Sequence, residues 1–77
     1  MATVRVQVYA SFREHLGQQV VDVPVTDGTT VDELVGRLLP SDLSEGLRCA
    51  VNGKFAERGC VVSDGDVVDL LPPFGGG

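Results

Sequence analysis

The residues best suited to chemistry stand at the C-terminal end of the chain, where three glycines carry the terminal carboxylate. Pro72 and Pro73 fix the backbone φ angle as the chain leaves its last predicted strand, and Phe74 follows as an exposed apolar side chain. Glycine has no side chain, so Gly75-Gly76-Gly77 can thread a narrow channel and place its carboxylate inside another protein's active site. The alternative is that the glycines are a frayed end or a cloning remnant.

Side chains elsewhere in the sequence offer no catalytic constellation. The chain has one histidine, His15, and lacks the spaced histidine, cysteine and glycine motifs of metal and phosphate sites. Cys49 falls on the apolar side of a predicted strand, so a packed thiol is a stronger interpretation than a nucleophile with His15 as its base. Cys60 is also interpreted as structural. Asp64 and Asp66 flank a glycine as turn residues do, so we predict neither a bound metal nor an enzyme.

Composition and charge narrow the class of protein. A chain of 77 residues forms one domain, because half of it could not bury a useful core. The net charge of -5 argues against a nucleic-acid partner; it suits a basic partner surface, or it only keeps the protein in solution. We expect a cytoplasmic protein with reduced cysteines and no membrane partner, since neither a signal peptide, a membrane span nor a disulfide framework is indicated.

Two strands are predicted before the first long helix. Residues 3–9 alternate between polar and apolar side chains, which is typical of a strand with one face in a core. Residues 19–25 alternate in the same way, and Pro24 places this strand at an edge or near a strand end, because proline has no amide to donate. Residues 11–17, between the two strands, are expected to form a short turn or helical bend.

A capping pattern opens the predicted helix. Thr30 is its N-cap residue, Glu33 completes a capping box, and Pro40 stops the helix after residue 39. Gly36 weakens the helix by roughly 1 kcal/mol relative to alanine, so we expect another backbone to approach closely there. The apolar stripe of the helix has helical spacing and comprises Val31, Leu34, Val35 and Leu38.

The second half of the chain contains strands joined by turns. After a polar connection over 41–46, we predict a strand over 47–52, a hairpin turn at Asn52-Gly53, a short return strand over 54–56 and a last strand over 66–71. This order of elements is typical of a two-layer α+β domain. A right-handed crossover through the helix would make the next strand parallel to its neighbour in the sheet.

Three stretches of the sequence resemble the MoaD/ThiS family of ubiquitin-like sulfur carriers. Residues 4–17, VRVQVYASFREHLG, look like the family's opening strand and its FA-x-LRE-x-x-G stretch. Residues 50–53, AVNG, resemble its central VN hairpin. Residues 64–77, DGDVVDLLPPFGGG, are similar to its DGDEV-x-x-x-PP-x-x-GG ending, which is the most specific of the three because it lies at the chain terminus.

The resemblance implies a β-grasp, or ubiquitin-like, α+β fold with a mixed sheet of four to five strands packed on one main helix. It also divides the chain into a β-grasp domain, 1–71, and a flexible C-terminal tail, 72–77. The family usually ends in two glycines after two variable residues. Phe74 and Gly75 occupy those two places here, which gives a third glycine and leaves open which activating enzyme accepts the tail.

The chemistry implied by the resemblance takes place at the carboxylate of Gly77. An activating enzyme of the ubiquitin-activating type adenylates it with that enzyme's own ATP and Mg²⁺, so this chain itself binds no cofactor. A sulfur donor then displaces AMP and leaves a thiocarboxylate. A synthase or large subunit receives the sulfur in molybdopterin, thiamin or another thio-metabolite pathway.

The remaining tail residues would bind the partner. Gly75 and Gly76 keep the tail narrow, while Pro72, Pro73 and Phe74 contact the partner outside the channel. Two alternatives stay open. A ubiquitin-like modifier would be joined to lysines through the same C-terminal glycine, and a plain binding module would dock through the aromatic residue of the tail and through the sheet.

Overall fold

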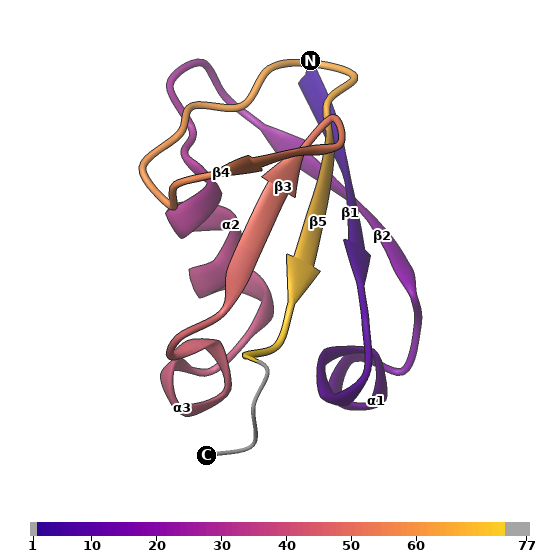
Figure 1. Ribbon diagram of the computed structural model, residues 1–77. Helices are drawn as coiled ribbons and strands as arrows, with labels where there is room; N and C mark the ends of the chain where they lie inside the picture. Colours follow the sequence, from indigo (N-terminus) through magenta and orange to yellow (C-terminus); the bar gives the residue numbers. More distant parts are fainter. Residues whose placement is uncertain (1, 74–77) are drawn as a thin grey trace.

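A mixed sheet of five strands, covered on one face by helix α2, forms the structure (Figure 1). The computed structural model describes residues 2–73. The elements in chain order are β1 (Ala2–Val8), α1 (Ser11–Leu16), β2 (Val20–Val25), α2 (Val31–Leu38), α3 (Ser41–Ser44), β3 (Arg48–Val51), β4 (Lys54–Ala56) and β5 (Val67–Leu71). The strand order is β2-β1-β5-β3-β4; β1 and β5 run parallel and the other neighbours antiparallel. This confirms the predicted α+β, β-grasp architecture with one main helix.

Alternating side chains along β1 place one face of the sheet in the core. Val4, Val6 and Val8 are fully buried, whereas the residues between them lie on the other face. β2 is an edge strand, as Pro24 predicts. Proline is tolerated at an edge because the outer side of the strand has no neighbouring strand to which an amide must donate. The segment between β1 and β2 is helical and forms α1, whose Phe12 is buried in the core.

The N-terminus of α2 is capped from two directions. The Thr30 hydroxyl accepts a hydrogen bond of 3.2 Å from the Glu33 amide, which is one half of the predicted capping box. The backbone carbonyls of Cys60 and Arg58 accept from the first two amides of the helix, at 2.9 and 2.7 Å. The loop between β4 and β5 is therefore fixed to α2, because it satisfies helix donors that have no partner within the helix.

The prediction of a close backbone approach at Gly36 is wrong. Gly36 is exposed, and a Cβ atom built on it would meet no heavy atom within 4 Å. The predicted apolar stripe does face the sheet, with Val31, Leu34 and Val35 fully buried. Gly36 lies outside that stripe, on the side of the helix that faces solvent, so packing gives no reason for a glycine there.

The region after α2 adds one element that was not predicted and contradicts one expectation. The predicted polar connection contains the one-turn helix α3, in which the amides of Leu43 and Ser44 both donate to the Pro40 carbonyl at 3.1 Å. β3 is parallel to neither of its neighbours, because it pairs antiparallel with both β4 and β5. The reason is that β5 inserts between β1 and β3 and takes the position beside β1 that a simple crossover would give to β3.

The β3–β4 hairpin forms where the sequence predicts it. Asn52 and Gly53 have φ angles of 52° and 85°, the left-handed conformations that a two-residue hairpin turn needs. The core lies between this sheet and α2 and is built mainly from valines and leucines. Its buried members are Val4, Val6, Val8, Phe12, Val23, Val25, Val31, Leu34, Val35, Leu39, Leu47, Cys49, Val62, Val68 and Leu70.

Candidate functional site

The tail predicted to carry the chemistry leaves from the centre of the sheet. β5 lies between β1 and β3, and its last residue, Leu71, pairs with Arg48. Pro72 is half-buried and Pro73 is exposed, and the ladder ends there because neither has an amide hydrogen. The other predicted site residues lie outside the described residues, so their roles stay predictions: Phe74, Gly75, Gly76 and Gly77.

The base of the tail lies against the turn between α3 and β3. Gly46 has a φ angle of 75°, in the left-handed region that glycine adopts without strain. A Cβ atom on Gly46 would lie 3.7 Å from the Cβ and 3.9 Å from the Cγ of Pro73. Any larger side chain at position 46 would meet the proline ring, so Gly46 leaves room for the tail to leave the sheet on this side.

The start of β5 is fixed by a set of hydrogen bonds between two turns. The carboxamide of Asn52 donates to Asp66 Oδ1 at 3.0 Å and accepts from the Val67 amide at 2.9 Å. Asp66 Oδ2 accepts from the Ser63 amide at 2.8 Å. The hydrogen bond from Asn52, followed by that from Ser63, lowers the pKa of the Asp66 carboxyl. Asp66 is thus a turn residue, as predicted.

A second polar contact joins β5 to the neighbouring β1. The Tyr9 hydroxyl lies 3.2 Å from Gln7 Oε1 and 3.2 Å from Asp69 Oδ1, so its single hydrogen can be donated to either acceptor or shared between them. Burial raises the pKa of Tyr9, and the negative charge of Asp69 raises it further. This contact fixes β5 close to the residues from which the tail departs.

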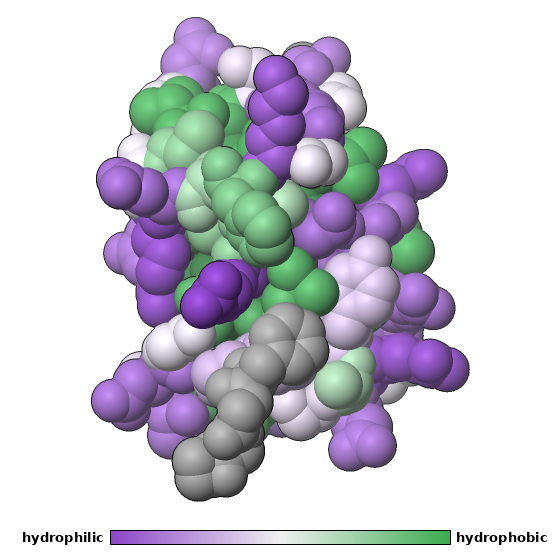
Figure 2. Space-filling view, in the orientation of Figure 1, coloured by the Kyte–Doolittle hydropathy of each residue, from purple (hydrophilic) through white to green (hydrophobic). Residues whose placement is uncertain are grey.

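The sheet face opposite α2 carries an apolar patch. Strand pairing places Ala50 opposite both Phe55 and Asp69, and Phe55 is 77% exposed. Figure 2 shows hydrophobic side chains gathered at the centre of this face, with hydrophilic side chains around them. We call this surface the open-face patch; it consists of Ala50, Phe55, Val67 and Leu71. An exposed aromatic residue in such a patch is typical of a protein contact.

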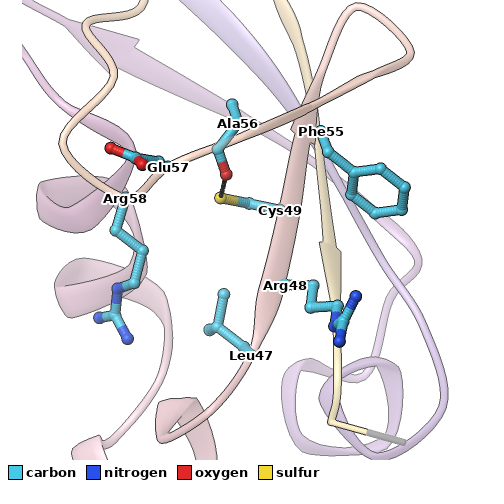
Figure 3. Close-up of a pocket in the computed structure, with 7 residues that line it drawn as sticks. All are labelled: Leu47, Arg48, Cys49, Phe55, Ala56, Glu57 and Arg58. Carbon is cyan, nitrogen blue, oxygen red and sulfur yellow. Dashed lines mark hydrogen bonds between the residues drawn. The ribbon is translucent and has the colours of Figure 1, made fainter.

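A groove of about 500 Å³ adjoins this patch at the edge of β3 (Figure 3). The β3–β4 ladder begins at the pair Cys49–Ala56, so Arg48 lies beyond it. Figure 3 shows Arg48 and Phe55 on one side of β3 and Cys49 on the other. The groove is lined by Leu47, Arg48, Cys49, Phe55, Ala56, Glu57 and Arg58.

Arg58 holds one wall of the groove in place. Its guanidinium forms an ion pair of 2.7 Å with Asp32 in the first turn of α2. It also donates to the carbonyl of Ser44, the last residue of α3, at 3.2 Å. Arg58 therefore links two helices to the β4–β5 loop, and its charge is already paired.

Cys49 and Cys60 occupy positions that fit the structural roles expected of them. Cys49 is buried, and its thiol donates to the Ala56 carbonyl at 3.0 Å. Burial raises the pKa of the Cys49 thiol, which works against a reactive thiolate. Cys60 is half-buried, both cysteines are free, and His15 is exposed on α1.

Gly46, Arg48 and the groove have no signal in the sequence. The Asn52-Gly53 turn does carry a usable signal, because its two-residue register places Phe55 opposite Ala50 and away from the core. Among residues 2–73, no three histidine, cysteine or acidic side chains gather as metal ligands do. In the same part of the chain, no helix is long and apolar enough to cross a membrane.

Comparison with solved structures places this fold among small ubiquitin-like proteins. Small archaeal modifier protein 1 of Haloferax volcanii is 28% identical, with 96% of this chain and 100% of that chain covered at a TM-score of 0.79. Molybdopterin-converting factor of Helicobacter pylori, in a complex of its subunits 1 and 2, is 25% identical, with coverages of 97% and 99% and a TM-score of 0.63. Urm1 of Trypanosoma brucei, 23% identical with coverages of 97% and 95% and a TM-score of 0.71, shares the fold alone.

A search of curated proteins finds no matching sequence. The model of the ThiS family, however, matches residues 6–77, which include every strand from the second half of β1 onward and the whole tail. The match extends through the tail, where the ending that resembles this family lies. This chain belongs to the ThiS family.

Proposed function

We propose that this chain is a sulfur carrier whose Gly77 carboxylate is adenylated by a partner enzyme and then converted to a thiocarboxylate. As a ThiS-family protein it acts with enzymes and is not itself a catalyst. The thiocarboxylate would give its sulfur to a synthase or large subunit in molybdopterin, thiamin or another thio-metabolite synthesis. We place these reactions in the cytoplasm, where ATP is available and free cysteines stay reduced.

The proposed reaction needs an activation step because a carboxylate is a poor electrophile. An oxygen of the Gly77 carboxylate attacks the α-phosphorus of ATP, held with Mg²⁺ by the partner, and pyrophosphate leaves. A hydrosulfide-type donor then attacks the carbonyl carbon, so that a C–S bond forms and the C–O bond to AMP breaks. No oxidation or reduction is required in these two steps, and the partner supplies the electrostatic stabilisation and excludes water.

The observation that carries the proposal is the position of the tail. The tail follows the central strand β5, whose start is fixed by Asn52 and Asp66 and whose end pairs with Arg48. The thiols and the histidine of the domain, by contrast, are either packed or isolated. The open-face patch lies beside the base of the tail and offers an apolar contact to the same partner.

The complex of one similar protein supports a partner of this kind. The Helicobacter pylori relative is described in a complex of two molybdopterin-converting factor subunits. A protein of similar fold from Amycolatopsis orientalis is described in a BexX/CysO complex, although at 24% identity the likeness shows the fold alone. We propose that this chain likewise binds its partners as a small subunit, with Pro72 and Pro73 in the contact and Gly75 and Gly76 in the channel.

A ubiquitin-like modifier is the second candidate function. The observation in its favour is the Haloferax volcanii protein, a small archaeal modifier by name, which is 28% identical over almost the whole of both chains. The activated Gly77 carbonyl would then be attacked by a lysine amine, with an isopeptide bond formed and AMP released. Both functions share the adenylation step and diverge only in the nucleophile that follows.

Intact-mass spectrometry separates these functions. The chain is incubated with an adenylating enzyme of the same organism, ATP, Mg²⁺ and sulfide, and with cell extract in a parallel reaction. Replacement of one oxygen by sulfur at Gly77 identifies the carrier, whereas covalent adducts with other proteins identify the modifier. A variant lacking Gly76 and Gly77 serves as the control. If the variant without Gly76 and Gly77 still performs the function of the full chain in the cell, the chain is a plain binding module and the proposal fails.

A substitution in the tail tests the narrow channel. Gly76→Val adds a branched side chain where only glycine is expected to fit, while the folded domain loses no core contact. We expect no measurable adenylation and an unchanged melting temperature. Normal adenylation of this variant would remove the channel from the proposal, although adenylation itself would stand.

A further inference from the structure

The segment that forms much of the groove beside β3 differs in charge from the rest of the protein, and the charged side chains that line the groove are Arg48, Glu57 and Arg58. Three of the six basic residues, but only one of the eleven acidic residues, fall within residues 48–58. The whole chain has a net charge of -5, so this segment is positive within an acidic protein. A charge of one sign gathered at a groove attracts groups of the opposite sign there, whatever the net charge of the molecule. The basic partner surface suggested by the net charge therefore does not describe this groove.

The two arginines of the groove are not equivalent. Arg58 is neutralised by Asp32 and held by the Ser44 carbonyl. Arg48 is exposed, and within residues 2–73 no side chain forms an ion pair or hydrogen bond with it. An exposed guanidinium with five donors is well suited to a carboxylate. Arg48 is therefore the cation that a ligand can use, and Arg58 is part of the supporting wall.

Apart from the two arginines and Glu57, the residues that line the groove are apolar or, like Cys49, weakly polar. Phe55 is 77% exposed beside Arg48, while Leu47 and Cys49 are buried below the surface. The thiol of Cys49 already donates to the carbonyl of Ala56, so it adds no unsatisfied polar group. A ligand that fits this surface combines a carboxylate with an apolar side chain.

The groove also adjoins the base of the tail. Arg48 is the sheet partner of Leu71, and Gly46, two residues before Arg48, lies beside Pro73. A protein that encloses the tail must cover this region. The groove shares Phe55 with the open-face patch, and both adjoin the base of the tail through Arg48 and Leu71.

We infer that the groove docks a segment of the tail-receiving enzyme in which a carboxylate pairs with Arg48 and an adjacent apolar side chain packs on Phe55. The identity of that enzyme rests on the proposed function; the chemistry of the segment rests on the groove. The carboxylate speeds encounter and fixes the orientation of the complex, while the apolar side chain slows its dissociation.

Three variants of the full chain test this docking site. Arg48→Glu reverses the free charge, Phe55→Ser removes the exposed aromatic ring, and Arg13→Glu makes the same charge reversal on α1, outside the groove. Each is titrated with a purified adenylating enzyme of the same organism, without ATP, by calorimetry at low and high salt. The same proteins are then assayed for ATP–pyrophosphate exchange. All three substituted positions are exposed, and circular dichroism confirms folding before use.

The docking site predicts a selective loss of binding. Arg48→Glu and Phe55→Ser are each expected to weaken binding about ten-fold or more, with the exchange rate at saturation retained. Arg13→Glu is expected to change binding less than about two-fold, and added salt to weaken the wild type more than Arg48→Glu. If Arg48→Glu binds like Arg13→Glu, the groove is not the docking site, whether or not exchange occurs.

The two measurements keep this inference separate from the proposed function. Wild-type binding without exchange, lost in Arg48→Glu, supports the docking site and overturns the adenylation of Gly77. Exchange accompanied by equal binding affinity in all variants supports adenylation and overturns the docking site. The absence of both binding and exchange overturns both.

Discussion

The side-chain carboxamide of Asn52 lies 3.0 Å from the carboxylate of Asp66, so the turn of the β3–β4 hairpin is joined directly to the turn that starts β5. The same Asn52 has a φ angle of 52° and accepts from the Val67 amide. Asn52 therefore forms the hairpin turn and also holds the start of β5, the central strand that carries the tail, through two side-chain hydrogen bonds.

Asp66→Asn should reduce the acid sensitivity of the fold. Hydrogen bonds from Asn52 and Ser63 keep the folded-state pKa of Asp66 below its ordinary value, so the folded state binds the proton more weakly than the unfolded state. The stabilisation is fully present above the unfolded pKa, about 3.9, and is lost as the pH falls through the folded pKa. At neutral pH, the free energy of unfolding of the variant should be about 1 kcal/mol lower than that of the wild type. When the pH is lowered, the free energy of unfolding should fall less for the variant than for the wild type.

Urea denaturation at pH 7 and pH 3 measures this difference. Asp27→Asn, on an exposed turn, removes a carboxylate away from the Asn52–Asp66 contact and is the matched control. If the free energy of unfolding falls equally between pH 7 and pH 3 in Asp66→Asn and in the control, the Asn52–Asp66 hydrogen bond contributes nothing to the pH dependence of stability.

Gly36→Ala should stabilise the protein. The added methyl group meets no atom within 4 Å, and alanine lowers the conformational entropy of the unfolded chain. The gain should be about 1 kcal/mol in the free energy of unfolding. Gly28→Ala is the opposite control: its site is equally open, but the φ angle of 85° strains an alanine. Thermal denaturation should show a higher melting temperature for Gly36→Ala and a lower one for Gly28→Ala, each relative to the wild type. The reverse order would contradict both the open site at Gly36 and the strain at Gly28.

Ala10→Gly should also stabilise the protein. Ala10 joins β1 to α1 with φ 52° and ψ -123°, a conformation that is costly for a residue with a Cβ atom. Relief of this strain should exceed the entropic cost of glycine and leave a gain of up to about 1 kcal/mol. Ala56→Gly, in the regular strand β4, should instead destabilise. Equal losses in the two variants would show that Ala10 is unstrained.

Gly46→Leu should disturb the tail more than the fold. Leucine at position 46 reaches Pro73, whereas leucine at Gly28, with a similar positive φ angle, meets open space. Both substitutions should therefore cost about the same folding free energy, on the order of 1 kcal/mol. Only Gly46→Leu should raise the KM for adenylation, since it displaces the base of the tail. Equal KM values for the two variants would show that the Gly46–Pro73 contact does not position the tail.

Local patterns explain most of the fold that could be predicted. Alternating valines define β1, Thr30 caps α2, and Asn52-Gly53 sets the hairpin, because each depends on a few adjacent residues. The insertion of β5 beside β1 depends instead on contacts about sixty residues apart, which no local pattern contains. Gly36 was misread for the same reason, since its exposure depends on what packs against the helix from elsewhere.

The candidate site divides along the same line. The tail could be proposed from the sequence because its prolines and glycines are contiguous and resemble a family ending. The groove could not be predicted from the sequence, because the role of Arg48 depends on two tertiary contacts. These are its pairing with Leu71 and the ion pair that Arg58 forms with Asp32. Neighbours brought together by the fold decide which of two similar arginines is available.

The central position of β5 has a consequence for the order of folding. Within residues 2–73, the β1–β2 hairpin and the β3–β4 hairpin have no strand pairing with each other and share a sheet only through β5. During synthesis both hairpins therefore leave the ribosome before the strand that unites them, and the high contact order of the β1–β5 pair delays completion of the sheet. Because the tail directly follows β5, its base is in place only on a chain that has finished folding.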